Sequence, residues 1–177
     1  LAFIDTPEFQ RLRHIKQLGF VHYIYPSAVH TRFEHSLGVM HLAGTMVDIL
    51  RRSVHITDRE KELVQVAGLL HDVGHVAGSH LIDYVLEEEG VNNHHEERSL
   101  TILNIINKRK HLLTDAEVDM VTKMIMGDAA FEEKPFLYEI VSNAITGLEV
   151  DRFDYLQRDA YHTGITGFQP EYLMQCA

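Results

Sequence analysis

The sequence predicts an all-α protein, and three observations support this prediction. Capping boxes begin at Thr31 and Thr57, and the run from Thr114 to Glu117 opens a further helix. Apolar residues recur at helical spacing behind these starts. No pair of alternating runs joined by a turn dipeptide indicates a β-hairpin. We expect roughly seven to nine helices, forming one domain over residues 1–177.

The first helix is expected over residues 7–19. Thr6 supplies its N-cap, Pro7 takes the first helical position, and Gly19 closes it. Residues 20–25 are aromatic and β-branched and are followed by Pro26, so we expect an extended loop or a short strand there.

The second helix, from Thr31 to about Arg52, carries Arg32 and His35 on one face because they are three residues apart. The third begins at Thr57, and its apolar stripe consists of Leu63, Val64, Ala67 and Leu70. The later helices are expected at 79–86, 95–108, 114–126, 136–145 and 149–161, with Ser79 as a cap and Gly90 as a stop after the first of them.

Composition narrows the class of protein. Of 177 residues, 45% are apolar and 24% are charged, which is ordinary for a soluble domain. The single cysteine, Cys176, excludes a disulfide framework and favours a reducing, intracellular and by default cytoplasmic setting, and no apolar run suggests a membrane span. The net charge of −10 argues against broad capture of nucleic acid, but not against a nucleotide substrate. The first residue is Leu1 rather than methionine, so we expect the core of a longer chain.

Two imidazoles and two carboxylates stand out as candidate ligands of one divalent metal ion: His35, His71, Asp72 and Asp151. Taken singly, each has an ordinary structural explanation, as a core histidine or a helix-capping aspartate. Together they suit Mn, Fe, Zn, Ni or Mg, and the sequence does not choose among these metals.

The motif from His71 to His75, followed by Ser79-His80, resembles the His-Asp-x-Gly-His core of the HD-domain phosphohydrolases. The stretches 4–19, 31–39, 136–143 and 151–155 are similar to the deoxynucleoside triphosphate triphosphohydrolases, most closely to the branch that contains the human SAM- and HD-domain protein. The resemblance implies an HD-domain helical fold with a buried mononuclear metal site. The implied ligands are the four residues named above.

The resemblance also implies the catalytic groups. The segment His95 to Ser99 fits the family's His-Glu-x-x-Ser, which makes His95 either the general acid at the leaving oxygen or a proton relay near the α-phosphate. Asp83 resembles the acidic residue that orients this histidine; its ordinary interpretation is a solvated helix carboxylate. His75 is also expected among the catalytic residues. With Arg32 and His80, it is expected to contact the phosphates.

On the sugar side, Asp151, Tyr155 and Asp159 are four residues apart and share a helix face. The resemblance implies that Tyr155 packs on the deoxyribose and that Asp159 and Gln17 approach its 3′-hydroxyl. Leu18 would crowd the 2′ position. Arg152, a lysine in the human branch member, would contact phosphate. The implied set is Gln17, Leu18, Arg152, Tyr155 and Asp159.

Asp5, Gln10 and Arg13 match residues that in that branch recognise an activating guanine nucleotide at a subunit boundary. Their ordinary interpretation is a residue before a helix cap and solvated polar positions on a helix. We expect the full-length protein to be a homo-oligomer with this activator.

The expected function is therefore hydrolysis of deoxynucleoside triphosphates to deoxynucleoside and triphosphate. Two alternatives stay open. One is another HD phosphohydrolase activity, on nucleoside monophosphates, cyclic nucleotides or ribonucleotides. The other is a non-catalytic nucleotide-binding module.

Overall fold

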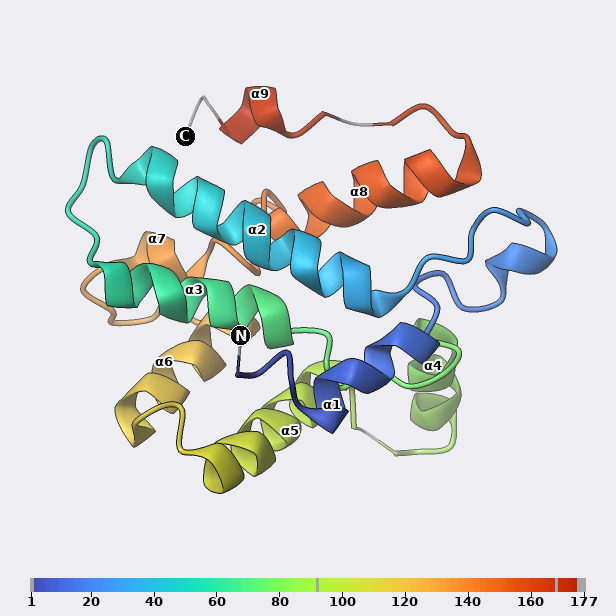
Figure 1. Ribbon diagram of the computed structural model, residues 1–177, viewed down its shortest axis with the longest axis horizontal. Coiled ribbons are helices and arrows are strands. Elements are labelled where there is room, and N and C mark those ends of the chain that lie inside the picture. Colours follow the sequence, from blue (N-terminus) through green and yellow to red (C-terminus); the bar gives the residue numbers. More distant parts are fainter. Residues whose placement is uncertain (1, 92, 168, 175–177) are drawn as a thin grey trace.

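The computed structural model describes residues 2–91, 93–167 and 169–174, and the regular elements in these ranges are helices. Within these ranges, β-type pairing is limited to an isolated antiparallel bridge between Lys16 and Thr31. The prediction of an all-α protein is confirmed, and Figure 1 shows the helices gathered around α2 (Arg32–Leu50).

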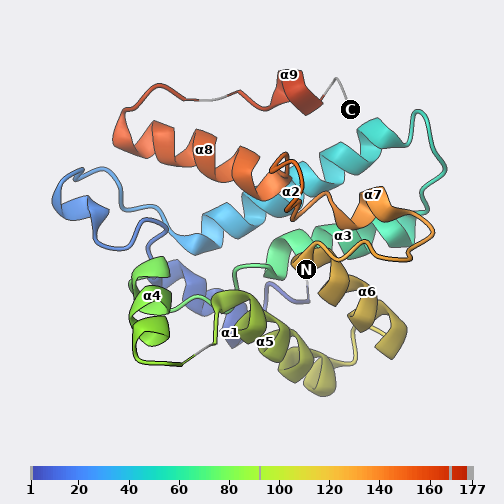
Figure 2. The ribbon, with the colours of Figure 1, turned by 180° about the vertical axis from the view of Figure 1, so that it is seen from behind.

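Helix α2 organises the molecule. It packs along α3 (Asp58–Leu70) and against α8 (Val150–Thr163), as both ribbon views show (Figures 1 and 2). Helix α3 also contacts α6 (Asp115–Met126), which in turn contacts α5 (His95–Lys110). The end of α3 and the start of α8 are therefore both held against α2.

The apolar core lies between these helices. Val39 and Val47 of α2, Val64 and Leu70 of α3, and Leu103 of α5 have no exposed surface. Burying one aliphatic side chain of this size is worth roughly 1.5–3 kcal/mol relative to leaving it exposed. The polar side chains at the ends of these helices are thus supported by a close-packed frame.

The helix starts expected at capping boxes are confirmed. The Thr57 hydroxyl accepts a hydrogen bond from the backbone N–H of Glu60 at 3.1 Å. The backbone N–H of Thr31 donates to the Glu34 carboxylate at 2.7 Å, so α2 begins where expected. The turn at Thr114 has the same two-way arrangement.

The N-terminal helix is shorter than expected. α1 (Pro7–Gln10) begins at the predicted cap, but the prediction that it runs to Gly19 is wrong. The chain tightens into a 3-10 turn, η1 (Arg11–His14), and then becomes extended. The segment before α2 pairs with the backbone there, since the N–H of Gln17 donates to the carbonyl of His30 at 3.0 Å.

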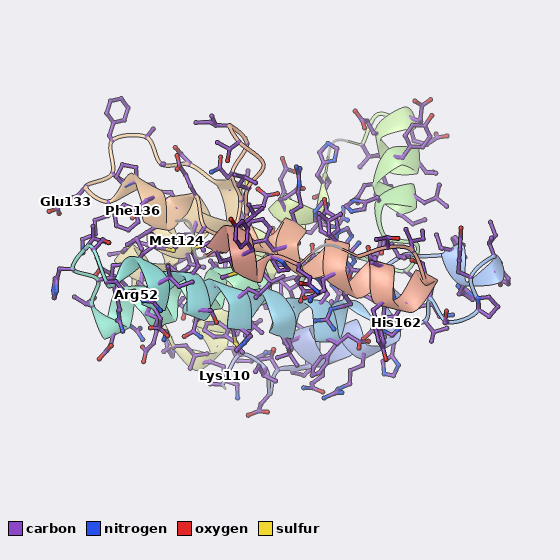
Figure 3. All side chains as sticks on the ribbon, turned by 90° about the horizontal axis from the view of Figure 1, so that it is seen from above. Arg52, Lys110, Met124, Glu133, Phe136 and His162 are labelled. Atoms are coloured by element: carbon purple, nitrogen blue, oxygen red, sulfur yellow. The ribbon has the colours of Figure 1, made fainter. Side chains whose placement is uncertain are left out.

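Residues 20–25 form a loop with a single 3-10 turn, η2 (Val21–Tyr23), so the short-strand alternative is wrong. The loop that follows returns to the far end of α8. There the Ser27 hydroxyl donates to the carbonyl of His162, and the His162 ring lies 3.2 Å from the Ser27 carbonyl. Figure 3 shows His162 at this end of α8, beside the loop.

Ser79 does not cap α4 (His80–Glu88), contrary to expectation. Its φ of 51° lies in the left-handed region, and its hydroxyl is used elsewhere. It accepts a hydrogen bond from Arg32 Nε at 3.2 Å and donates to the carbonyl of Lys16 at 3.0 Å. Ser79 therefore ties the start of α4 to the segment before α2.

The helix expected over 136–145 is limited to α7 (Pro135–Tyr138). Further along, the Asn143 side chain accepts hydrogen bonds from the backbone N–H groups of Ile145 at 3.1 Å and Thr146 at 3.0 Å. An asparagine that satisfies the backbone in this way stabilises a turn in place of a helix.

The C-terminal part contains one helix that was not expected, α9 (Glu171–Met174). Cys176 lies outside the described residues. In the part of the chain that the structure describes, no helix combines the length and the apolar character needed to cross a bilayer.

Candidate metal centre and active site

A cavity of about 290 Å³ lies where the first turn of α2, the end of α3 and the start of α8 meet. Its walls include most of the site residues expected from the sequence: Gln17, Leu18, Arg32, His71, Asp72, His80, His95, Asp151, Tyr155 and Asp159. His35, His75 and Asp83 are buried directly behind these walls. Segments far apart in the sequence thus contribute to one cavity.

The four candidate metal ligands lie together. The Nε2 atoms of His35 and His71 are 3.0 and 3.3 Å from the same oxygen of Asp151. They are 3.4 and 3.5 Å from the two oxygens of Asp72. Ligand atoms that surround one cation at roughly 2.0–2.2 Å are separated by distances close to these. His35, His71 and Asp72 have ligand atoms that all lie within 4.8 Å of one another, and Asp151 joins this set through its contacts with the two imidazoles. This geometry suits a single ion.

The donor atoms are also available for a cation. His71 donates from Nδ1 to the carbonyl of Gly68 at 2.8 Å, and His35 Nδ1 lies 2.7 Å from a carboxylate oxygen of Asp154. This leaves both Nε2 atoms facing the centre, buried and without a well-formed hydrogen bond to any described residue. Buried polar atoms without partners are rare in folded proteins, and a ligating cation explains them.

Charge at the centre has the sign that a cation requires. Burial alone would lower the pKa of His35, but the carboxylates of Asp151, Asp154 and Asp72 around it raise that pKa to about 10. Burial would raise the pKa of Asp72 and of Asp151, yet the neighbouring His71 imidazole holds both well below the usual range. The field that favours positive charge on His35 equally favours a divalent cation at the same place.

The turn that carries His71 and Asp72 is fixed by side chains that the sequence analysis missed. The buried hydroxyl of Ser99 donates to the carbonyl of His71 at 2.6 Å and accepts from the N–H of Gly74 at 2.8 Å. Arg98 donates to the carbonyl of Gly74 at 2.9 Å, and Arg11 donates to the carbonyls on either side of it. A Cβ on Gly74 would lie 2.1 Å from a backbone oxygen of α5, so only glycine fits this approach.

His95 is the first residue of α5. It faces the four candidate metal ligands, His35, His71, Asp72 and Asp151 (the metal group), across the cavity. Its Nδ1 is 3.0 Å from one oxygen of Asp83, and Arg98 donates to the other oxygen at 2.5 Å. The His95 ring stacks on the ring of His75, with centroids 3.9 Å apart, and the His80 ring stands edge-on at 5.1 Å. The structure thus brings Asp83 and His95 together, with the carboxylate against one nitrogen of the imidazole.

Titration behaviour separates these groups. Burial lowers the pKa of His75 to about 3, so this ring is neutral at physiological pH. Burial also lowers the pKa of His80. Burial would raise the pKa of Asp83, but its bonds to Arg98 and His95 lower it, so this group is a carboxylate. The Asp83 oxygens already contact His95 and Arg98. The cluster of His75, His80, Asp83 and His95 is therefore better suited to proton transfer than to binding a second cation.

Arg32 is buried and committed to the metal group. It donates to the Asp72 carboxylate, to the Ser79 hydroxyl at 3.2 Å and to the carbonyl of Gln17 at 3.3 Å. It still lines the cavity, so a phosphate there would meet the guanidinium beside Asp72.

Tyr155 and Asp159 also form part of the cavity wall and follow Asp151 along α8. An oxygen of the Asp159 carboxylate lies 2.6 Å from His30 Nε2. The ring of His30 stacks on the ring of His162, with centroids 4.2 Å apart. Gln17 is buried, and its side-chain oxygen has no hydrogen-bond partner among the described residues. This wall therefore presents an apolar ring beside polar groups.

Four expected residues lie elsewhere. Arg152 is exposed on α8 and is absent from the walls of the cavity; its guanidinium lies beside Gly147. Asp5, Gln10 and Arg13 lie around α1, where Arg13 Nε donates to the Gln10 side chain at 2.8 Å. Asp5 is exposed there. The structure thus keeps these three near one another, apart from the metal group.

Asp154 was also missed. It lies three residues after Asp151, and that spacing alone would place it on the same side of a helix. Ser99 and Arg98 could be found only as part of the segment that opens with His95. Nothing in the sequence indicates the contacts of Arg11 with the turn.

The model of the HD domain family matches residues 32–159. A protein of Dictyostelium discoideum named deoxynucleoside triphosphate triphosphohydrolase SAMHD1 homolog is 41% identical over 172 residues, which cover 93% of this chain and 33% of that protein. The human deoxynucleoside triphosphate triphosphohydrolase SAMHD1 is 40% identical over 193 residues, covering 93% of this chain and 31% of the relative.

A putative HD domain-containing protein, L394, from Acanthamoeba polyphaga mimivirus is 39% identical over 183 residues, covering 92% of this chain and 39% of that protein. The chain therefore spans about a third of the length of the curated relatives that it matches. The match includes every residue of the metal group and His95.

Proposed function

The chain belongs to the HD-domain family, and from that premise we propose that it cleaves deoxynucleoside triphosphates into the deoxynucleoside and triphosphate. The observation that carries this proposal is the placement of the metal group and His95 around one cavity. The chain that has this cavity is about 40% identical to proteins named for that activity.

The metal would be held by His35, His71, Asp72 and Asp151. Two imidazoles and two carboxylates suit Mn, Fe, Zn, Ni or Mg. A divalent cation bound there supplies polarisation of a phosphoryl oxygen and a lowered pKa for a bound water. The unpartnered Nε2 atoms of the two histidines support this assignment.

His95 is the proton donor in the proposed reaction. The bond that breaks joins the 5′-oxygen to the α-phosphorus, and the leaving oxygen needs a proton as it departs. Asp83 lies 3.0 Å from His95 Nδ1, which leaves Nε2 directed into the cavity toward Asp72 at 4.0 Å. The Asp83 carboxylate holds the ring in place for the transfer.

The triphosphate would lie against Arg32 and His80, while His75, which the resemblance also assigns to the phosphates, does not line the cavity. Arg32 offers a cationic group at the cavity wall, and His80 reaches the same wall from the start of α4. His75 is neutral and lies behind them, so it acts by positioning the neighbouring rings. Arg152, exposed near the opening of α8, would meet a phosphate that extends out of the cavity.

The deoxyribose would pack on Tyr155, with Asp159 and Gln17 at its 3′-hydroxyl. Leu18 also lines the cavity and would crowd the 2′ position. An apolar wall rejects a 2′-hydroxyl because the group would clash and would lose its hydrogen bonds to water.

Analysis of the products tests the reaction. The chain is incubated with each dNTP and each NTP in the presence of Mn²⁺, and the phosphorus products are identified. Inorganic triphosphate from dNTPs is the expected result. Orthophosphate, or hydrolysis of monophosphates or cyclic nucleotides, would instead show another HD phosphohydrolase activity. Binding without turnover would show a nucleotide-binding module.

We also propose that Asp5, Gln10 and Arg13 form part of a guanine-nucleotide site that activates a homo-oligomer. An exposed carboxylate can accept hydrogen bonds from a guanine N1–H and 2-amino group, and an arginine can donate to O6 or N7. The exposure of Asp5 and the bond from Arg13 to Gln10 support this assignment.

A further inference from the structure

Asp154 lies on the side of His35 that faces away from the cavity. Its Oδ2 is 2.7 Å from His35 Nδ1, and both side chains are buried, at 7% and 1% exposure. The opposite nitrogen of the same ring, Nε2, faces Asp72 and Asp151. One imidazole therefore joins the metal group to a second carboxylate behind it.

Arg158 holds the Asp154 carboxylate from one turn further along α8. Its Nε donates to Oδ2 at 2.8 Å, and its terminal Nη2 donates to Oδ1 at 2.7 Å. A two-point contact of this kind fixes the plane of the carboxylate as well as its position. The oxygen that faces His35 is thus held as an acceptor, so His35 Nδ1 must carry the proton.

Gly38 provides the space for this pair. It lies three residues after His35 on α2, where a Cβ would be 1.9 Å from Asp154 Oδ1 and 2.4 Å from a terminal nitrogen of Arg158. In a helix interior, glycine is less stable than alanine by about 1 kcal/mol. The close approach of the carboxylate explains why glycine is nevertheless used.

We propose that Asp154 is a positioning residue for the metal site: it fixes His35 in the form protonated on Nδ1, which leaves the Nε2 lone pair directed at the cation. Arg158 and the open space at Gly38 keep the carboxylate in place. This inference rests on the metal site of the proposed function and not on its reaction. It requires no particular substrate.

The first test compares Mn²⁺ binding by the wild-type chain and by Asp154→Asn, using the electron paramagnetic resonance signal of free Mn²⁺. Asparagine has nearly the same shape, but its amide can donate to Nδ1 and so favours the wrong form of the imidazole. The Kd for Mn²⁺ should rise about 10–100-fold, the range found when such outer partners of a ligating histidine are removed. The melting temperature of each variant without metal reports on folding.

Gly38→Ala provides a second test that leaves Asp154 in the chain. The added methyl group must displace the carboxylate or Arg158, so Mn²⁺ affinity should fall although alanine favours the helix. Gly44→Ala is the matched control on the same helix, because the three atoms nearest to its Cβ would all belong to the side chain of Gln65, the closest at 2.5 Å. That side chain can move away, and Mn²⁺ affinity should stay at the wild-type value.

Each outcome bears on the inference. Weakened binding in Asp154→Asn and in Gly38→Ala, with Gly44→Ala unchanged, supports it. Wild-type affinity in Asp154→Asn overturns it, and so does an equal loss in the two glycine variants. Failure of the wild-type chain to bind Mn²⁺ would overturn the metal site itself. An absence of dNTP hydrolysis with Mn²⁺ binding intact would count against the proposed reaction and leave this inference standing.

Discussion

Among single residues, His95 has the surroundings of a proton donor. Asp83 holds one nitrogen of its ring, and the other lies 4.0 Å from an oxygen of Asp72, facing the cavity. Replacing the ring should therefore remove proton transfer and leave the metal ligands intact.

We expect His95→Ala to lower kcat for dNTP hydrolysis by about 100-fold or more, the usual scale for general acid catalysis. Bound metal, measured by elemental analysis of the purified variant, should equal that of the wild type. His94→Ala is the matched control, because the preceding histidine lies outside the walls of the main cavity and forms no capping hydrogen bond. Loss of metal from His95→Ala would place that ring among the ligands and contradict the assignment.

Leu18 is expected to set the preference for deoxyribose over ribose. Leu18 forms part of the wall of the cavity that Tyr155 also lines, so shortening its side chain should open room for a 2′-hydroxyl. Wild type should prefer dGTP to GTP, and in Leu18→Ala the ratio of the two kcat/KM values should fall about tenfold. Leu81→Ala, at an exposed leucine outside that wall, should leave the ratio unchanged. Equal use of dGTP and GTP by the wild type would exclude the steric explanation.

Among the elements, α5 matters because it supplies both His95 and the hydroxyl that holds the metal-binding turn. Ser99 joins the carbonyl of His71 to the N–H of Gly74, and all three groups are buried. Removing one partner leaves buried backbone groups unpaired, which costs about 1–3 kcal/mol.

Ser99→Ala should therefore lower the free energy of unfolding by about 1–3 kcal/mol, measured by urea denaturation. Thr101→Ala is the control on the same helix. Its exposed hydroxyl donates to the carbonyl of Glu97 within the helix, so its loss should change stability by less than about 0.5 kcal/mol. A similar loss in both variants would show that the Ser99 bridge contributes little.

Some helix boundaries could be predicted from the sequence and others could not. The starts of α2, α3 and α6 could be predicted because a capping box satisfies its backbone groups with residues three positions apart. The end of α1 could not, because the backbone after it pairs with residues just before α2, as between Gln17 and His30. The short α7 has a similar cause, since Asn143 satisfies the turn beyond it.

Ser79 illustrates the limit for a single residue. Its type and position before a helix favour a cap, yet its hydroxyl bonds to Arg32 and Lys16, which lie far away in the sequence. For the site, motif similarity could indicate candidate ligands, but the partners behind them, Asp154 and Ser99, become visible only when α8 and α5 are placed against α2 and α3.

For the whole molecule, the arrangement around α2 explains how one cavity draws on distant segments. Helix α2 contributes Arg32 and His35, α3 ends at His71, and α8 begins beside Asp151 (Figures 1 and 2). Asp5 lies two residues before α1, and Arg11, the first residue of η1 directly after α1, donates to the turn after Asp72. A ligand at Asp5 could therefore affect the metal-binding turn through a short, continuous path.

This path leads to a prediction on activation. If a guanine nucleotide binds at Asp5, GTP should stimulate dATP hydrolysis by roughly fivefold or more, the lower range of measured couplings between sites. Asp5→Ala should abolish the stimulation and keep the unstimulated rate, because Asp5 is exposed and away from the cavity. Asp115→Ala, at an exposed aspartate of another helix start, is the control and should respond to GTP like the wild type.

The assay requires the longest natural form of the protein, since the chain spans about a third of its relatives and an oligomer can draw on other segments. Sedimentation with and without GTP shows whether stimulation accompanies association. Stimulation that persists in Asp5→Ala would place the activator elsewhere. No stimulation of the wild type would mean that Asp5, Gln10 and Arg13 serve the structure around α1 alone, where Arg13 already lies 3.6 Å above the ring of Phe33 and bonds to Gln10.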